Sequence, residues 1–528
     1  MKIRKPWIAA PLGAATAVTL LTGCGSGDGG GAGTGDAAAV IMGMSDDVKS
    51  VDPASGYDPG SWIVFNNVFQ SLLAFPKGGT TPEPDAAQSC GFVGAGGTTF
   101  RCVLRPDQKF SNGHALTAKD VKFSFERTLR IADEAGPAVM LSSIAGIDTP
   151  DDKTVVFRLK HADATFPSKI ASGAGAIVDS REYPADALRT DGKAIGSGPY
   201  TLDVHEPHKQ LRFAVNPEYS GAAKPRNSGV TLKLYDRDQA ALRAAVEKGE
   251  IDLAFRGLSA ADVAGLDTAG AGGVTAVQGT GAEVQHLVFN LKDPVLGKAP
   301  VRQAIAQLID RGALVNDVHH GTVDPLYSIV PAGIAGHTTA FSDRYGLSPR
   351  PDKAREILQK AGITGKTAVT LWSTPSRFGP ATDPEMRAIA QQLNASGLFS
   401  AEVKSVEYER YEKDVQAGKY GIYVKGWVPD YPDPDNFTQP FFGPGNVLGN
   451  HYENDEITDR ILPATAAATD RTATTGDYAR LQALVAEDVP MIPLWQGKQY
   501  AVTRPNVSGA QWSLDSSTVF RFAELGKS

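Results

Sequence analysis

A strand that runs directly into a proline-rich loop constrains this chain more than any other stretch. Residues 420–424 read Tyr-Gly-Ile-Tyr-Val, and tyrosine, isoleucine and valine are typical of a β-strand. Pro429, Pro432 and Pro434 follow, and because they remove backbone donors and fix φ, neither a strand nor a helix continues there. In open α/β sheets, ligands bind outside the carboxyl ends of the strands. The loop is therefore expected to lie beside a ligand.

The side chains of this loop are candidate ligand groups. Trp427 and Tyr431 are predicted to form an aromatic platform with Val428 between them, and aspartates follow at positions 430, 433 and 435. A carboxylate here can neutralise a ligand ammonium group, and an indole can stack on that group or cover it. A structural interpretation stays open, since aspartate and proline are also typical of surface turns.

Strand–helix–strand alternation elsewhere favours an α/β fold. The pattern predicts a strand over 230–235, a helix over 239–248 that ends at Gly249, and a strand over 251–254. Further strands are expected at 285–290 and 500–503. This order is typical of sheets covered by helices. At 528 residues the chain is too long for one ordinary domain, so two or three domains are expected.

Composition and motifs exclude several classes of protein. Hydrophobic residues make up 42% and charged residues 21%, as in a globular protein, and the net charge of −7 argues against a nucleic-acid-binding surface. The sequence contains no His-Glu-x-x-His, no Gly-x-Ser-x-Gly and no phosphate-binding loop. The spacing of the loop aspartates fails a calcium loop, because Phe437 takes the next alternate position. We therefore expect no metal, no cofactor and no enzymatic activity, with a secreted peptidase as a remote alternative.

The N-terminus has the features of an export signal. Lys2, Arg4 and Lys5 precede an apolar stretch over 7–21, which is short for a membrane span. The stretch ends in Leu-Thr-Gly-Cys, which resembles a bacterial lipobox with Cys24 as the lipidated residue. These features predict a signal peptide over 1–23, a flexible Gly-rich tether over 24–37 and a lipid anchor on the outer face of the cell membrane. An ordinary secretory cleavage site is the alternative.

Two cysteines remain after the signal, Cys90 and Cys102. The residues between them are expected to form two short strands around a glycine turn, so in an exported protein they predict a hairpin disulfide. A disulfide closing a loop of this size stabilises by about 3 kcal/mol in the chain-entropy model. The alternative is a two-cysteine metal site, for which His114 is the one nearby histidine.

Several segments together resemble a known family. The late segment is Gly426-Trp427-x-x-Asp430-Tyr431-x-Asp433-Pro434-x-x-Phe437, and the segment 110–127 begins Phe-Ser-Asn-Gly and ends Phe-Ser-Phe-Glu-Arg. Residues 195–200 read Ile-Gly-Ser-Gly-Pro-Tyr, and 302–311 fit Arg-x-Ala-Ile-x-x-x-Ile-Asp-Arg. These segments resemble the family 5 extracellular solute-binding proteins, which are oligopeptide and dipeptide receptors of ABC importers. The resemblance extends from about Val40 to the end of the chain.

The resemblance implies a periplasmic-binding-protein-like α/β fold of the cluster C type, in which two lobes joined by a hinge carry an extra smaller domain. It places lobe I in three pieces, at 38–68, 186–283 and 500–528, domain II at 69–185 and lobe III at 284–499. Within domain II, Thr117 and Asp120 are predicted to cap a helix on which Val121 and Phe125 are buried. Strands crossing between the lobes would allow hinge closure over a ligand.

The resemblance also implies a function. It predicts a monomeric binding protein that delivers short peptides to a membrane permease driven by a separate ATPase, without nucleic-acid partners. Asp430 would hold the peptide α-amino group, and Arg377 would grip the peptide carboxylate, although Pro375-Ser376-Arg377 is one residue shorter than the family pattern. A solvated role for Arg377 stays open. The same transport role with a nickel chelate, a sugar or an amine metabolite as ligand is the main alternative.

Overall fold

The computed structural model describes residues 38–94, 96–269, 273–375 and 377–528. The predicted signal peptide, Cys24 and the tether lie outside the described residues. Across the described ranges, none of the helices combines the length and the apolarity that crossing a bilayer requires.

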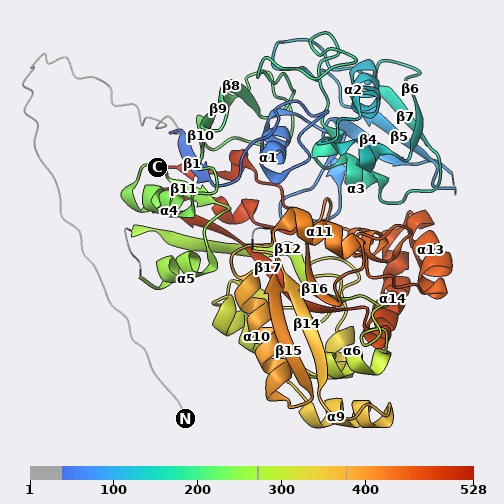
Figure 1. The fold of residues 1–528 in the computed structure, drawn as a ribbon. Helices are drawn as coiled ribbons and strands as arrows, with labels where there is room; N and C mark the ends of the chain where they lie inside the picture. The colour runs from blue at the N-terminus through green and yellow to red at the C-terminus, as the bar shows by residue number, and fades with distance from the viewer. Residues whose placement is uncertain (1–37, 95, 270–272, 376) are drawn as a thin grey trace, which may run out of the picture. The chain divides into compact units, whose positions relative to one another are not determined.

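One mixed sheet runs through most of the described chain, with helices packed against it (Figure 1). Its strand order is β15-β14-β16-β12-β17-β11-β1-β10-β9-β8, with β13 added beside β17. The prediction of an α/β fold is confirmed. The strands are β1 (Val40–Met44), β8 (Tyr200–Glu206), β9 (Gln210–Val215), β10 (Gly229–Leu234), β11 (Leu253–Phe255), β12 (Thr275–Phe289), β13 (Val323–Pro325), β14 (Thr367–Ser373), β15 (Phe399–Ser405), β16 (Ile422–Trp427) and β17 (Met491–Thr503).

Two long strands, β12 and β17, belong to both halves of this sheet. Residues 284–289 of β12 pair with β16, and residues 501–503 of β17 pair with β11. The two strands are antiparallel to each other, and their register breaks between Thr280 and Val284. They connect the β1 side of the sheet to the β14 side, and the break marks a point where the sheet can bend.

Both strands extend much further than the sequence predicts. The expected strands at 285–290 and 500–503 are only the ends of β12 and β17. Pro493 argues against a strand, but it lies where the register shifts at Gln285 and His286, and such an irregularity tolerates a residue without an N–H group. The predicted domain boundaries at 283–284 and 499–500 fall inside these strands and stay a prediction.

A second, antiparallel sheet has the order β4-β5-β7-β6, formed by β4 (Ala87–Phe92), β5 (Thr99–Leu104), β7 (Thr154–Leu159) and β6 (Ile144–Asp148). Cys90 and Cys102 face each other across β4 and β5, and a disulfide joins them with Cα atoms 4.1 Å apart. Helix α2 (Ala118–Ile131) begins at the predicted capping box, in which the Thr117 N–H donates to the Asp120 carboxylate over 2.9 Å.

Most of the remaining described helices cover the main sheet or connect its strands, and the helix that contains Phe166 packs on the second sheet. They include α1 (Pro59–Val68), α3 (Phe166–Ile170), α4 (Gln239–Lys248), α5 (Ala260–Ala269), α6 (Ala299–Ala306), α7 (Arg311–Ala313), α8 (Ala340–Tyr345), α9 (Pro351–Lys360), α10 (Thr382–Ala395), α11 (Tyr408–Gln416), α12 (Gln439–Phe442), α13 (Leu462–Ala467) and α14 (Thr475–Asp488). Gly249 ends α4 in the left-handed conformation with φ of 77°, as the sequence predicts.

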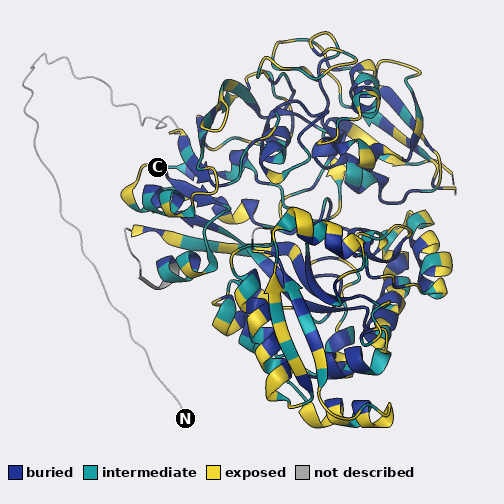
Figure 2. Ribbon diagram, in the orientation of Figure 1, coloured by how far each residue is buried: buried dark blue, intermediate teal, exposed yellow. Residues whose placement is uncertain are grey.

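Buried apolar side chains gather into separate clusters. The largest surrounds β12, β14 and β16, a second surrounds β1 and α1, and a third fills the space between the second sheet and α2. Buried residues concentrate in the strands and on the helix faces turned toward them (Figure 2). The short two-stranded pieces β2 (Leu73–Ala74) with β3 (Glu83–Pro84), and β18 (Val507–Ser508) with β19 (Gly526–Lys527), lie outside the two larger sheets.

Candidate functional site

The loop after β16 is an ordered turn. The chain leaves the main sheet at Trp427, and a 3₁₀ turn forms over Pro434–Phe437. Asp433 caps this turn, since its carboxylate accepts the Asp435 N–H over 2.9 Å. The prolines and this cap hold the loop in one conformation at the end of β16.

Asn436 joins the two principal candidate residues. Its side-chain oxygen accepts the Trp427 indole N–H and the Asp430 backbone N–H, each over 3.0 Å. Its amide nitrogen donates to the Asp430 carboxylate over 3.3 Å. One buried amide therefore fixes the indole and the carboxylate together. The sequence alone does not predict this role for Asn436, and its one signal is an asparagine within the Asp/Pro-rich loop.

The Asp430 carboxylate is half-buried, and its hydrogen-bond donors within the described residues are neutral. Burial raises the pKa of Asp430, and hydrogen bonds from Tyr57 and Asn436 oppose that rise. Tyr57 precedes α1, and burial together with the Asp430 charge raises the pKa of its phenol. No cation pairs with Asp430 among the residues that the structure describes. An ammonium group would therefore be stabilised at this carboxylate.

The other two aspartates of the loop, Asp433 and Asp435, bond to side chains of the protein itself, whereas the sequence predicts that they lie beside the ligand. Asp433 forms a two-pronged ion pair with Arg471, over 2.6 and 2.9 Å. Asp435 accepts the Tyr431 hydroxyl over 3.1 Å, and the Tyr431 ring is buried in the cluster beside α2. The Tyr431 ring is thus largely covered by the protein, and its predicted place in the aromatic platform stays a prediction. Trp427 stays partly exposed and Val428 is 42% exposed.

Arg377 lies in the segment between β14 and α10, and its side chain is exposed. The guanidinium carbon stands 5.6 Å from the centre of the Tyr408 ring. Next to it, Phe378 packs on Gly426, where an added Cβ would meet the phenyl ring at 2.9 Å. Since β14 pairs with β16, the Arg377 segment and the strand that leads to Asp430 lie side by side. Arg377 forms no ion pair within the described part of the chain.

The buried Asp435 carboxylate is expected to make the stability of the fold depend on pH. Burial and the nearby Asp433 charge raise the pKa of Asp435 to about 6, against the favourable charges of Lys169 and Arg471. Because the folded-state pKa is raised, ionised Asp435 destabilises the fold above pH 6, and the cost vanishes below the unfolded pKa near 4. Asp435→Asn is expected to raise the free energy of unfolding by up to about 3 kcal/mol at pH 7.5, and by less as the pH falls toward 4.

Urea unfolding of wild type and Asp435→Asn at pH 7.5 and pH 4.5 measures this effect. Asp459→Asn is the matched control, because Asp459 is exposed and, within the described ranges, its carboxylate accepts a hydrogen bond from the neighbouring Thr458 hydroxyl alone. A stability gain that stays the same at both pH values would contradict the assignment.

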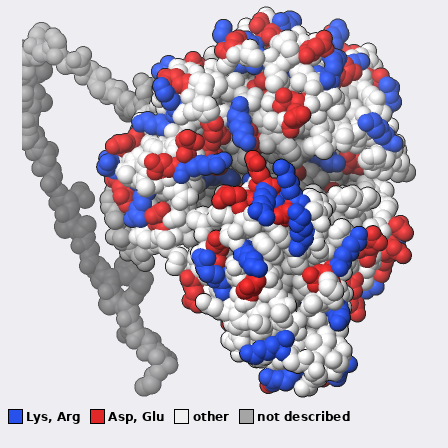
Figure 3. All heavy atoms as spheres, in the orientation of Figure 1, with Lys and Arg blue, Asp and Glu red and all other residues white. Residues whose placement is uncertain are grey.

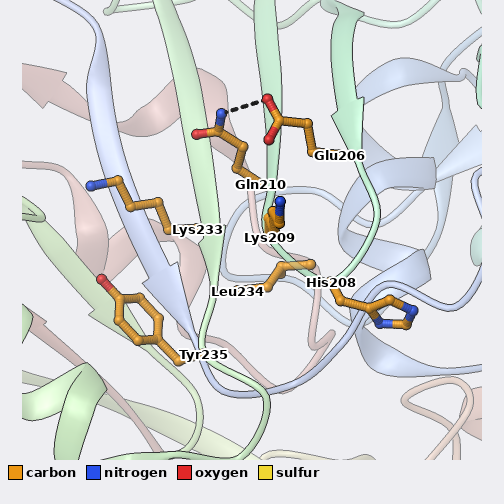
Figure 4. Close-up of a pocket in the computed structure, with 7 residues that line it drawn as sticks. All are labelled: Glu206, His208, Lys209, Gln210, Lys233, Leu234 and Tyr235. Atoms are coloured by element: carbon orange, nitrogen blue, oxygen red, sulfur yellow. Dashed lines mark hydrogen bonds between the residues drawn. The ribbon is translucent and has the colours of Figure 1, made fainter.

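A separate recess of about 420 Å³ lies at the turn between β8 and β9, against the end of β10 (Figure 4). Gln210 donates to Glu206 over 3.0 Å there, and His208 pairs with Asp47 over 2.8 Å. None of the predicted ligand residues lines it, so it is not the candidate site. Its lining residues are Glu206, His208, Lys209, Gln210, Lys233, Leu234 and Tyr235.

Comparison with known proteins gives a family match over most of the chain. The model of the bacterial extracellular solute-binding proteins, family 5, matches residues 81–449. The matched range contains the predicted site residues Arg377, Trp427, Val428 and Asp430, and the Cys90–Cys102 pair.

Individual relatives match along nearly their whole length. The probable D,D-dipeptide-binding periplasmic protein of Escherichia coli is 27% identical over 508 residues, covering 92% of this chain and 94% of that protein. Heme-binding protein A of Haemophilus influenzae is 25% identical over 487 residues, covering 86% and 85%. A periplasmic binding protein from Helicobacter pylori, solved in complex with the peptide STSA, superposes with a TM-score of 0.73 at 21% identity, covering 93% of this chain and 98% of that one.

Proposed function

Because the chain belongs to the bacterial extracellular solute-binding proteins, family 5, we propose that it binds short peptides as the substrate-binding component of an ABC importer. The observation that carries the peptide assignment is the half-buried Asp430 carboxylate, which has neutral donors and, among the described residues, no cation beside it. The dipeptide specificity in the name of the Escherichia coli relative supports the same ligand class.

The proposed mechanism is recognition of both peptide ends. The peptide α-ammonium binds Asp430. There it neutralises the carboxylate charge, which the hydrogen bonds from Tyr57 and Asn436 only partly stabilise. Trp427, held by Asn436, covers that end, and exposed Val428 lies beside it. Arg377 grips the peptide carboxylate, since a guanidinium matches a carboxylate by two parallel hydrogen bonds. Side chains between the ends would face water-filled space, which tolerates different sequences.

Closure of the lobes is the proposed delivery step. The register break between Thr280 and Val284 lets β12 and β17 bend, so the two halves of the sheet close over the ligand. A membrane permease driven by a separate ATPase then receives the peptide from the closed monomer. Lipidation of Cys24 would hold the protein at the outer face of the membrane.

A non-peptide ligand is the second candidate. Heme-binding protein A is similar to this chain over most of its length, yet it is named for a different solute. Asp430 would equally bind an amine-bearing metabolite. A peptidase is less well supported, because the relatives named above are binding proteins and the sequence lacks a nucleophile motif.

Native mass spectrometry of the protein from residue 38 onward, purified without denaturation, tests the proposal. We expect a ladder of bound masses that matches mixed short peptides and limits their length. A single non-peptide mass would keep the receptor class and overturn the peptide assignment. Incubation with the bound peptides, followed by a search for cleavage products, tests the peptidase alternative.

A further inference from the structure

Tyr431, the residue after Asp430, packs into a part of the fold that is distant in sequence. Its ring is 6% exposed and belongs to the cluster between the second sheet and α2, whose other buried members all lie within residues 72–177. The strand that leads to this turn, β16, belongs instead to the largest cluster, together with β12 and β14. The Tyr431 ring therefore joins two separately packed parts of the fold.

The same cluster also holds a donor of the ammonium site. Tyr57 is partly buried against this cluster, and its hydroxyl donates to the Asp430 carboxylate. Trp62 on α1 packs on the cluster as well, and its ring centre lies 5.7 Å from that of Tyr57. The cluster thus fixes Asp430 through the neighbouring Tyr431 and fixes the donor of Asp430 through the Tyr57 ring.

A second contact joins the same two parts of the fold. The Ala164 N–H, just before α3, donates to the backbone oxygen of Ala466 on α13 over 2.8 Å. Arg471 links α13 to the turn, because its guanidinium pairs with Asp433 and also donates to the backbone oxygen of Thr465. The turn and α13 therefore meet the second-sheet part as one connected unit.

The ion pairs near this contact are each made within one part. Lys169 pairs with Asp163 over 2.8 Å in the second-sheet part, and Arg471 pairs with Asp433 in the other. Acidic and basic side chains are interspersed over the outer face drawn in Figure 3. What joins the two parts here is an apolar ring and a backbone hydrogen bond, so burial of the Tyr431 ring carries the contact.

We propose that Tyr431 is a positioning residue for ligand retention, whose ring holds the Asp430 turn against the second-sheet part so that a bound peptide leaves slowly. The inference rests on the proposed function. Because Asp430 and Tyr57 are anchored to the same cluster, loss of the ring lets the carboxylate move away from its donor while both groups remain. Tyr431 thus acts on the ligand through Asp430.

Release of radiolabelled Ala-Ala and Ala-Ala-Ala into an excess of unlabelled peptide measures retention. Tyr431→Ala is expected to release peptide at least about tenfold faster, because the buried ring is lost, with the association rate unchanged within about threefold. Tyr431→Phe keeps the ring and should release peptide within about threefold of the wild-type rate. If circular dichroism shows that Tyr431→Ala does not fold, Tyr431→Leu should change release in the same direction by a smaller factor.

Tyr452→Ala is the matched control. Tyr452 is also a buried tyrosine, 7% exposed, and its hydroxyl also donates to an aspartate, Asp488, over 2.7 Å. Its ring lies in the largest cluster, away from the second sheet. Tyr452→Ala is therefore expected to lower stability and to leave the release rate within about threefold of wild type.

A disulfide between Ala164→Cys and Ala466→Cys tests whether the ring acts by holding the two parts together. The backbone hydrogen bond between these residues brings their Cα atoms to about the 4.4–6.8 Å separation that a disulfide spans. Formed with peptide bound, the disulfide should return release from Tyr431→Ala to within about threefold of wild type. Either cysteine alone should leave release from Tyr431→Ala fast.

Wild-type release rates in Tyr431→Ala would overturn the inference. Equally fast release from Tyr452→Ala would also overturn it, since any loosening of the fold would then free the peptide. Fast release that the disulfide does not slow would make Tyr431 a direct ligand contact instead, and a cysteine pair that does not cross-link would show that the contact is not kept in solution. These results leave the proposed function in place, because wild type still binds. Wild type that binds neither peptide would overturn the proposed function together with this inference.

Discussion

Asp430→Ala is expected to weaken peptide binding by about 100-fold to 5,000-fold. The ligand ammonium would be buried without its partner, and removal of one member of a buried charge pair costs about 3–5 kcal/mol. The loop itself should persist, because Asn436 still accepts the Trp427 indole N–H and the backbone N–H of residue 430. Isothermal titration calorimetry with a short peptide measures the loss.

The pH dependence of binding gives an independent test of the same carboxylate. Because burial raises the pKa of Asp430, lowering the pH protonates it earlier than an ordinary aspartate, and the ammonium loses its counterion. Peptide affinity of wild type is therefore expected to fall as the pH drops through that raised pKa. Asp430→Asn, which does not ionise, should bind weakly at every pH.

Asp435→Asn is the matched control for these measurements. Asp435 belongs to the same loop and is a buried carboxylate, but it accepts a hydrogen bond from the Tyr431 hydroxyl. Its substitution should leave peptide affinity within about threefold of wild type, an effect below 1 kcal/mol. The assignment of the ammonium site to Asp430 is wrong if Asp430→Ala binds peptide as tightly as Asp435→Asn does.

The sequence predicts those parts of the fold that local patterns determine. The capping box of α2 and the glycine that ends α4 each depend on residues within a few positions of one another. The lengths of β12 and β17 could not be predicted in this way. Gly279, Gly281 and Pro493 interrupt the local strand pattern, and the pairing of residues 275–288 with 491–503 overrides them.

The residues of the candidate site also differ in whether a local sequence pattern predicts them. Trp427 and Asp430 can be singled out because a strand pattern ends beside them. Tyr57 reaches the Asp430 carboxylate from the other end of the sequence, so no local pattern indicates that contact. Asp433 has the same residue type in the same loop, yet it pairs with Arg471, and only the folded arrangement separates a structural carboxylate from an available one.

The largest expected effect on stability comes from the buried pair of Asp52 and Arg127. Two hydrogen bonds of 2.7 and 2.6 Å join the carboxylate to the guanidinium, and the side chains are 2% and 1% exposed. Arg127 lies on α2 and also donates to the backbone oxygens of Pro184 and Ala187. Arg127 therefore connects α2 to the turn before α1, where Asp52 lies, and to the segment that follows β7.

Arg127→Met is expected to lower the free energy of unfolding by about 3–5 kcal/mol, because it leaves the Asp52 carboxylate buried without a cation. Urea unfolding followed by circular dichroism measures the change. Arg130→Met on the same helix is the matched control, since its pair with Asp186 is exposed and should contribute less than about 1 kcal/mol. Asp52→Asn combined with Arg127→Met should cost less than the two single substitutions added together, because the double variant removes both charges of the pair. Equal losses in Arg127→Met and Arg130→Met would show that the buried pair does not stabilise the fold.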